Sequence, residues 1–268
     1  MPNRPIAFSL SLLAALAIPV AVEAQQSSTP VWGLHRAFKV KPGKAAEFEK
    51  YFADTIRKYH QARKDAGMER MWTLNKVVIP AGLEAPYDYT SSSYSDQFPP
   101  LDQSALELSP LMEKAGTTRE KLLATVGDLA TLVRTMVSYR IESLGTVEPG
   151  DFVRVDYMKV APGKGSDYVN LERTIYKPLH EARIKEGTIS AWSLSAVVMP
   201  GGSERPFDYF TTNVVKTSDA LGAPPRTSAV AAFAKIHPNV NYVGTMNRTQ
   251  ELRTIVRSYV LRAKEILR

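Results

Sequence analysis

The chain contains two copies of one sequence unit, and this repeat limits its folding more than any other feature. When the sequence is shifted by 120 residues, positions 39–89 align with positions 159–209 without a gap, and 19 of the 51 aligned residues are identical. Ordinary residue frequencies would give about three identities by chance. The identical pairs with polar or aromatic side chains include His60/His180, Arg63/Arg183, Trp72/Trp192 and Asp88-Tyr89/Asp208-Tyr209. A duplication of this kind predicts two units with the same fold.

Apolar periodicity predicts one order of elements in each copy: strand, helix, strand, strand, helical region, strand. Alternating apolar residues at 32–40 and 152–160 predict the first strand, and Pro-Gly turns lead from it into an amphipathic helix. Gly67 and Gly187 are expected to end these helices. The other strands are expected at 71–79, 87–95 and 137–144, and at 191–199, 207–215 and 257–263. More divergent helical regions at 102–132 and 224–252 precede the last strands.

This βαββαβ order resembles the ferredoxin-like fold, and two such units with packed sheets resemble the dimeric α+β barrel superfamily. The strand that runs into Lys-Val-Lys-Pro-Gly-Lys at 39–44, with Phe48 on the helix behind it, is similar to NIPSNAP-type and antibiotic-biosynthesis-monooxygenase-type members. Val-Ala-Pro-Gly-Lys at 160–164 repeats the motif. We therefore predict an α+β chain whose two tandem ferredoxin-like βαββαβ units, at 31–145 and 150–267, form a pseudo-dimeric α+β barrel.

The resemblance implies a fold and leaves the function open. Members of this superfamily serve as cofactor-less oxygenases, haem-binding enzymes, isomerases and binding modules, so the reaction must be inferred from the site.

The first 24 residues are typical of a secretory signal peptide. Arg4 supplies a positive charge, an apolar run follows at 6–22 with a break at Pro19, and small residues before Gln25 predict cleavage after Ala24. An uncleaved membrane anchor is the alternative, although the run is short for a span of about 20 residues. We expect a periplasmic or secreted protein with no stable membrane span after cleavage.

Composition and motifs argue against several chemistries. The chain has no cysteine, which excludes disulfides, thiolate nucleophiles and cysteine metal sites. Its net charge of +7 is spread along the chain without a dense basic run, so no nucleic-acid partner is predicted. Neither a His-Glu-x-x-His motif nor a Gly-x-Ser-x-Gly elbow nor a phosphate-binding glycine loop occurs. We predict no metal and no cofactor; haem on a histidine ligand is the low-ranked exception.

The histidine–arginine pairs are the candidate catalytic residues. His60 and Arg63, like His180 and Arg183, lie three residues apart and share a helix face at the margin of the apolar stripe. The arginine could hold an anion while the histidine moves a proton or binds a metal. The alternative is a solvated helix end, where both cations interact with the helix dipole. We favour the second copy, which has Tyr176 one turn before His180.

Further residues are candidates for ligand binding, each with a structural alternative. Trp72 and Trp192 could stack on a ligand, although a core position is the stronger interpretation. Asp88, Asp208 and Tyr209 could present polar groups, or the aspartates could cap a turn beside a core tyrosine. Opposite the tryptophans, the polar strand face of Thr73, Asn75, Ser193 and Ser195 could meet a small polar ligand or water. Arg36 and Asp156 occupy equivalent positions and could form an ion pair across the barrel.

Three function classes follow from these features. The first is a protein that binds a small molecule. The second is a cofactor-independent monooxygenase or isomerase in which histidine acts as a base and arginine orients an oxyanion. The third is a structural or interaction protein without a site. The sequence does not name the ligand, decide whether the protein is an enzyme or fix its oligomeric state, for which a monomeric pseudo-dimer is one arrangement.

Overall fold

The computed structural model describes residues 31–82, 85–101, 105–222 and 226–268. The expected signal peptide at 1–24 lies outside these residues. Within the described ranges, no helix combines the length and the apolar character that a membrane crossing requires.

The first copy contains four strands and two helical regions, and a π-helical turn interrupts the first of these regions. Its elements are β1 (Val31–Val40), α1 (Ala45–Tyr51), the π-helical turn η1 (Phe52–Ile56), α2 (Arg57–Asp65), β2 (Met71–Ile79), β3 (Tyr89–Ser95), α3 (Ala105–Lys114), α4 (Arg119–Leu129) and β4 (Ala130–Gly145).

The second copy repeats this order and adds a short 3₁₀ helix after its third strand. Its elements are β5 (Phe152–Val160), α5 (Gly165–Leu171), the π-helical turn η2 (Glu172–Tyr176), α6 (Lys177–Lys185), β6 (Ala191–Met199), β7 (Tyr209–Val215), η3 (Ser218–Leu221), α7 (Arg226–Ile236), α8 (Tyr242–Leu252) and β8 (Arg253–Leu267).

The eight strands form a closed barrel in the order β1-β3-β2-β8-β5-β7-β6-β4. Each copy supplies four neighbouring strands, and the long last strands join the two halves: β4 pairs with β1 and then with β6, while β8 pairs with β5 and then with β2. All of these pairs are antiparallel, and each of the eight strands has a neighbouring strand on both sides. The predicted pseudo-dimeric α+β barrel is confirmed.

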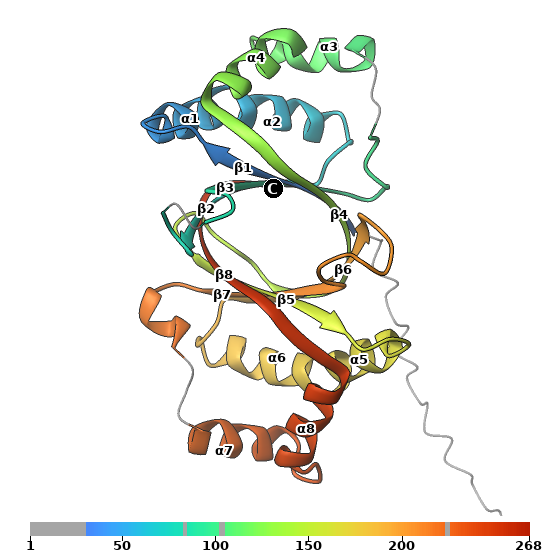
Figure 1. Cartoon of the computed structure of the whole chain (residues 1–268). Helices are drawn as coiled ribbons and strands as arrows, with labels where there is room; N and C mark the ends of the chain where they lie inside the picture. The colour runs from blue at the N-terminus through green and yellow to red at the C-terminus, as the bar shows by residue number, and fades with distance from the viewer. Residues whose placement is uncertain (1–30, 83–84, 102–104, 223–225) are drawn as a thin grey trace, which may run out of the picture.

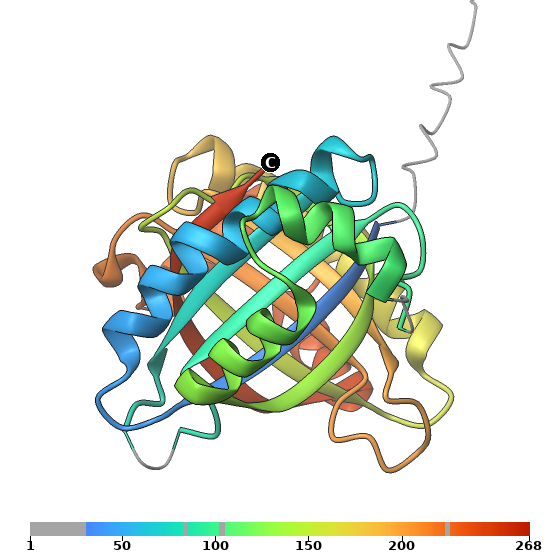
Figure 2. The same ribbon diagram turned by 90° about the horizontal axis from the view of Figure 1, so that it is seen from above.

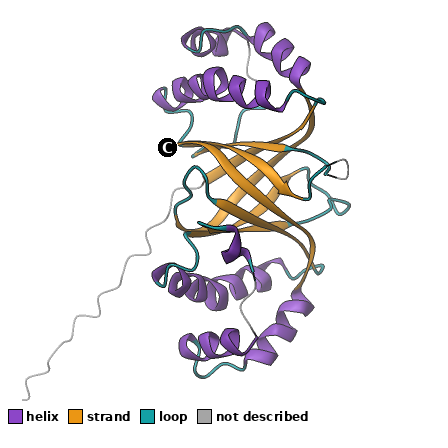
Figure 3. Cartoon of the chain, turned by 90° about the vertical axis from the view of Figure 1, so that its left-hand side faces the viewer, coloured by secondary structure: helices purple, strands orange, loops and turns teal. Residues whose placement is uncertain are grey.

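The helices lie outside the barrel on two opposite faces. Those of the first copy cover one face and those of the second copy cover the other. In each half the second pair of helices lies outside the first pair (Figures 1 and 3). Viewed from above, the first-copy helices cross the strands beneath them (Figure 2). Trp72 and Leu74 are fully buried between the sheet and these helices, as Trp192 and Leu194 are in the second copy. Both tryptophans therefore occupy core positions, and Trp192 also lines a cavity.

The last strands begin earlier than the sequence predicts. β4 starts at Ala130 and β8 at Arg253, whereas we expected strands from 137 and 257. Several residues in the first part of each strand are exposed, Leu132 and Val133 among them. That part therefore shows no alternation of buried and exposed positions, and apolar periodicity does not detect it.

The expected ion pair between Arg36 and Asp156 is wrong. Both side chains line cavities on the helix side of their sheets, so the whole barrel separates them. Asp156 accepts hydrogen bonds from Arg154 Nε at 3.0 Å and Ser258 Oγ at 2.5 Å. The complementary charges arose at positions that face different helix layers.

Candidate functional site

One cavity of the first copy lies between the sheet and its helices. It measures about 430 Å³ and has a mainly apolar wall. Residues of this wall include Leu34, Phe38, Phe52, Ile56, Met68, Leu108 and Met112. The polar residues that line it include Arg36, Tyr59, His60, Arg63, Glu69, Ser91 and Ser93. Size and composition match pockets that hold a small organic molecule by its apolar body and a few polar contacts.

His60 is held in one orientation by two neighbours. Its ring is stacked on Trp72, with the centroids 4.8 Å apart and the planes inclined by 13°. Its Nδ1 lies 2.9 and 3.0 Å from the two carboxylate oxygens of Glu69, whose side chain is 1% exposed. Since a carboxylate accepts, Nδ1 donates, and Nε2 has no hydrogen bond among the described residues. Burial lowers the pKa of His60, and the Glu69 bond partly offsets this effect.

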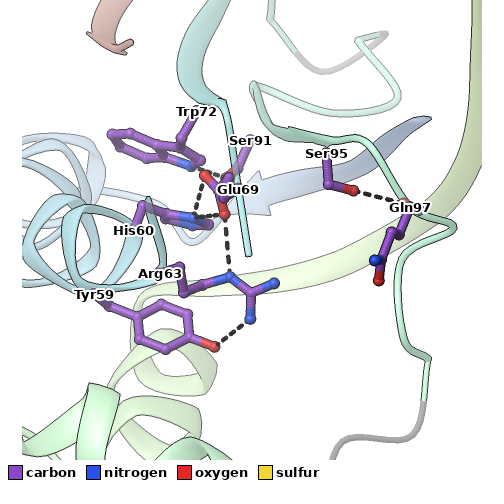
Figure 4. Close-up of polar contacts among 8 residues, drawn as sticks. All are labelled: Tyr59, His60, Arg63, Glu69, Trp72, Ser91, Ser95 and Gln97. Atoms are coloured by element: carbon purple, nitrogen blue, oxygen red, sulfur yellow. Dashed lines mark hydrogen bonds and ion pairs between the residues drawn. The ribbon is translucent and has the colours of Figure 1, made fainter. Parts of the chain in front are cut away.

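Glu69 also joins the histidine to the arginine of the pair. Arg63 Nε donates to Glu69 at 3.1 Å, and another guanidinium nitrogen donates to the Tyr59 hydroxyl at 3.1 Å (Figure 4). Behind them, Trp72 Nε1 donates to Ser91 Oγ at 2.8 Å. Glu69 therefore serves as the shared acceptor of a small polar network that borders an apolar cavity.

Local backbone structure brings these side chains together. Arg63 lies one turn after His60 on α2, so both point to the same side. Gly67, with φ of 70°, then reverses the chain in a conformation that favours glycine. The amide of Met68 donates to the carbonyl of Arg63 at this turn, and Glu69 follows directly beside His60. The turn after the helix therefore supplies the carboxylate.

The expected position of His60 at the margin of the apolar stripe is wrong, since the residue is only 5% exposed. That prediction counted a constant 100° per residue along the helix. The π-helical turn η1 lies between α1 and α2, and its wider turn rotates every later residue around the axis. His60 consequently points to the core, and the interpretation as a solvated helix end does not hold for it.

The equivalent cavity of the second copy is smaller and more polar. It measures about 280 Å³ and is lined by His180, Arg183, Tyr176 and Trp192, among others. His180 is stacked on Trp192 at 4.8 Å, as in the first copy. Burial and, to a lesser extent, the charge of Arg183 lower the pKa of His180 to about 3. The Tyr176 hydroxyl is bonded to Thr249 Oγ1 at 2.8 Å.

Four of the predicted ligand-binding residues line none of the three cavities found among the described residues. Trp72 is one of them and is stacked on His60, and the other three make structural contacts. Asp88 accepts from the backbone amide of Val40 at 2.8 Å, and Asp208 accepts from that of Val160 at 2.8 Å. These bonds fix the start of the third strand beside the end of the first one. Tyr209 packs edge-on against the ring of Tyr168. The structure does not bring these three residues to the histidine–arginine pairs.

A third cavity of about 270 Å³ lies inside the barrel. Thr73, Asn75 and Ser193 line it, so the polar strand face points into the lumen. His35 also lies there, and its two ring nitrogens are bonded to Ser92 Oγ at 2.9 Å and Ser138 Oγ at 2.8 Å. Both nitrogens have partners, which gives this histidine a structural role.

Glu69 is the functional residue that sequence reasoning missed. It stands where the second copy has Ile189, and a search for identical pairs passes over such a position. In the described residues, no cluster of three or more His, Cys, Asp or Glu side chains could hold a metal ion.

Comparisons with known proteins give the fold. No protein-family model matches the sequence, and no curated protein is significantly similar to it. A proposed monooxygenase from Fusobacterium nucleatum superimposes with a TM-score of 0.52 at 12% identity, covering 90% of this chain and 94% of that chain. A proposed monooxygenase from Lactobacillus acidophilus gives a TM-score of 0.51 at 9% identity, covering 89% and 95%. An anthrone oxidase-like protein gives 0.52 at 11%, covering 90% and 94%.

At these identities the likeness concerns the fold alone. The shared architecture spans both copies and matches the closed barrel described above. The chain therefore has the dimeric α+β barrel fold, with both halves of the barrel in a single polypeptide.

Proposed function

We propose that this protein binds a small molecule with an apolar body and one oxygen-bearing group in the first-copy cavity. The observation that carries the proposal is a mainly apolar cavity of about 430 Å³ bordered by one prearranged polar network around Glu69. Burial of the apolar body provides most of the binding free energy, and the few polar contacts set its orientation.

The charges at the cavity favour an electron-rich oxygen on the ligand. Arg36 and Arg63 both line it, and Glu69 is the acidic residue of the lining. Burial lowers the pKa of Arg36, which reflects the cost of keeping its charge away from water. An oxyanion or polarised carbonyl near these guanidinium groups would offset part of that cost.

The second candidate function is a cofactor-independent monooxygenase or isomerase, and the His60–Glu69 pair favours it. Glu69 fixes the tautomer of His60 with Nδ1 protonated and would stabilise the imidazolium that forms when Nε2 takes a proton. Arg63 and Arg36 would stabilise the negative charge left on the substrate oxygen. The resulting carbanion could then react with O₂ or be reprotonated at another position.

Anthrone tests both candidates, because it has a flat apolar body, one carbonyl oxygen and an acidic C–H group. Anaerobic titration calorimetry should show one saturable site. His60→Gln should weaken binding about tenfold, the effect of losing about 1.4 kcal/mol, while the matched variant His180→Gln should leave it unchanged. An equal loss of anthrone affinity in both variants, or the absence of saturable binding to the unmodified protein, would contradict the proposal.

Activity is then tested with O₂. Conversion of anthrone and O₂ to anthraquinone and water should be measured by absorbance and oxygen uptake. If the protein is an enzyme, His60→Gln should lower kcat by a larger factor than it lowers the affinity for anthrone. If anthrone binds but is oxidised only at the uncatalysed rate, the binding function is retained and this enzymatic oxidation is rejected.

We also propose that the protein acts outside the cytoplasm, because residues 1–24 have the pattern of a cleaved signal peptide. Expression of the full chain in a bacterial host should yield periplasmic protein whose intact mass lacks residues 1–24. Full-length protein in the membrane fraction would indicate the uncleaved anchor instead.

A further inference from the structure

The two copies differ at the residue that neutralises the histidine–arginine pair. In the first copy, Glu69 accepts from both His60 Nδ1 and Arg63 Nε. In the second copy, Ile189 occupies the equivalent position, is 2% exposed and belongs to an apolar cluster. The pair is thus retained while its acceptor is lost.

The loss leaves polar groups without partners in the second-copy cavity. Within the described part of the chain, His180 Nδ1 is buried without a hydrogen bond. Asn213 Oδ1 and Arg253 Nε are buried and unbonded in the same way, and both residues line this cavity. The guanidinium of Arg183 has no ion pair among the described residues either, and burial lowers its pKa. Buried polar groups without hydrogen-bond partners are costly, and they are rare in folded proteins unless a ligand or water bonds to them.

The remaining charges of the cavity do not supply the missing acceptor. Asp156 is bonded to Arg154 and Ser258. Glu172 is 4% exposed and lies near Tyr168 and Arg253, and its burial raises its pKa to about 7. The cavity lining therefore holds three arginines and two acids, which leaves an excess of positive charge next to His180.

The first copy shows which chemical group completes such a pair, namely a carboxylate. We propose that the second-copy cavity binds a small carboxylic acid whose carboxylate accepts hydrogen bonds from Arg183 and His180, in the role that Glu69 has in the first copy. The volume of about 280 Å³ and the apolar contacts offered by Trp192, Val215 and Leu221 suit an acid with a short chain or a single ring. The site is independent of the function proposed for the first cavity.

Benzoate and its uncharged analogue benzamide test this site by titration calorimetry. Benzoate should bind with one-to-one stoichiometry. Benzamide should bind at least about tenfold more weakly, since its neutral carbonyl cannot form the charged, bidentate pair that a carboxylate forms with a guanidinium. Arg183→Gln should weaken benzoate binding at least about tenfold. The control Lys185→Gln removes an exposed charge from the same helix and should have no effect. Equal affinity for benzoate and benzamide, or unchanged binding by Arg183→Gln, would overturn the proposal.

A second variant tests whether a protein carboxylate at the position equivalent to Glu69 can take the place of the bound acid. Ile189→Glu places a carboxylate where the first copy has one, and it should abolish benzoate binding while leaving anthrone binding unchanged. Circular dichroism will show whether this variant folds. If it does not, the effect of Arg183→Gln on benzoate binding is the test of the proposal. Absence of saturable benzoate binding to the unmodified protein up to about 10 mM would also overturn the proposal. Loss of anthrone binding without loss of benzoate binding would refute only the first-cavity function.

Discussion

Glu172→Gln should stabilise the protein at alkaline pH and leave its stability unchanged at acidic pH. Glu172 lies in the π-helical turn η2 with 4% of its surface exposed. Burial raises the pKa of this carboxyl group from 4.5 to about 7, although nearby Tyr168 and Arg253 act in the opposite direction. The folded protein therefore holds the proton of Glu172 more tightly than the unfolded chain does.

The magnitude follows from the linkage between protonation and folding. A raised pKa stabilises the fold fully below pH 4.5, and this contribution is lost as the pH rises through about 7. The change from 4.5 to about 7 corresponds to about 3 kcal/mol. Glutamine has nearly the shape of protonated glutamate and does not ionise. The free energy of unfolding of the variant should therefore equal that of the unmodified protein near pH 4 and exceed it by about 3 kcal/mol near pH 8.5.

Urea unfolding followed by tryptophan fluorescence measures this difference at several pH values. His180 titrates in the same cavity, and its pKa of about 3 makes the fold less stable as the pH falls below 6.5. Comparing the variant with the unmodified protein at one pH removes most of that contribution. Glu181→Gln, at an exposed position on α6, is the control and should show no pH-dependent difference. A Glu172→Gln difference that is constant with pH, or that grows toward acid, would refute the reasoning.

Two further predictions concern the first-copy polar network and the junctions between the first and third strands. Glu69→Ala should lower the free energy of unfolding by about 3–5 kcal/mol, because it removes the buried carboxylate that accepts from both His60 and Arg63. The control Glu47→Ala, in an exposed pair with Lys44, should lower it by less than about 1 kcal/mol in the same urea assay. Asp208→Ala should lower the melting temperature more than Asp88→Ala, since its side chain is 11% exposed against 29%; equal shifts would contradict this.

The fold could be predicted because the repeat and the apolar periodicity agree. Apolar and polar residues alternate over 72–75 and 192–195, and the structure contains strands β2 and β6 over the expected ranges 71–79 and 191–199. The early parts of β4 and β8 could not be predicted, since their side chains are largely exposed while their backbones pair with β1 and β5. Pairing of that kind depends on a partner strand distant in sequence, which local patterns do not show.

The site was predicted only in part, for two physical reasons. His60 and Arg63 were identified because both copies keep them, but their burial was missed because the π-helical turn changes the helical phase. Glu69 was missed because its importance lies in a difference between the copies. The emphasis on the second copy rested on Tyr176, whose hydroxyl is bonded to Thr249. The structure instead places the larger cavity and the complete polar network in the first copy.

Exchanging the acid between the copies should move the carboxylate site. The double variant Glu69→Ile/Ile189→Glu removes the carboxylate that His60 and Arg63 share and supplies one to His180 and Arg183. If the position of a single carboxylate decides which cavity receives an external acid, this variant should bind one benzoate in the first cavity. That binding should be weakened at least about tenfold by Arg63→Gln and unaffected by Arg183→Gln, the reverse of the original chain. Benzoate binding that still depends on Arg183 would show that features other than this acid distinguish the cavities. In a symmetric dimer of identical chains the two cavities could not differ in this way, because every substitution would change both cavities at once.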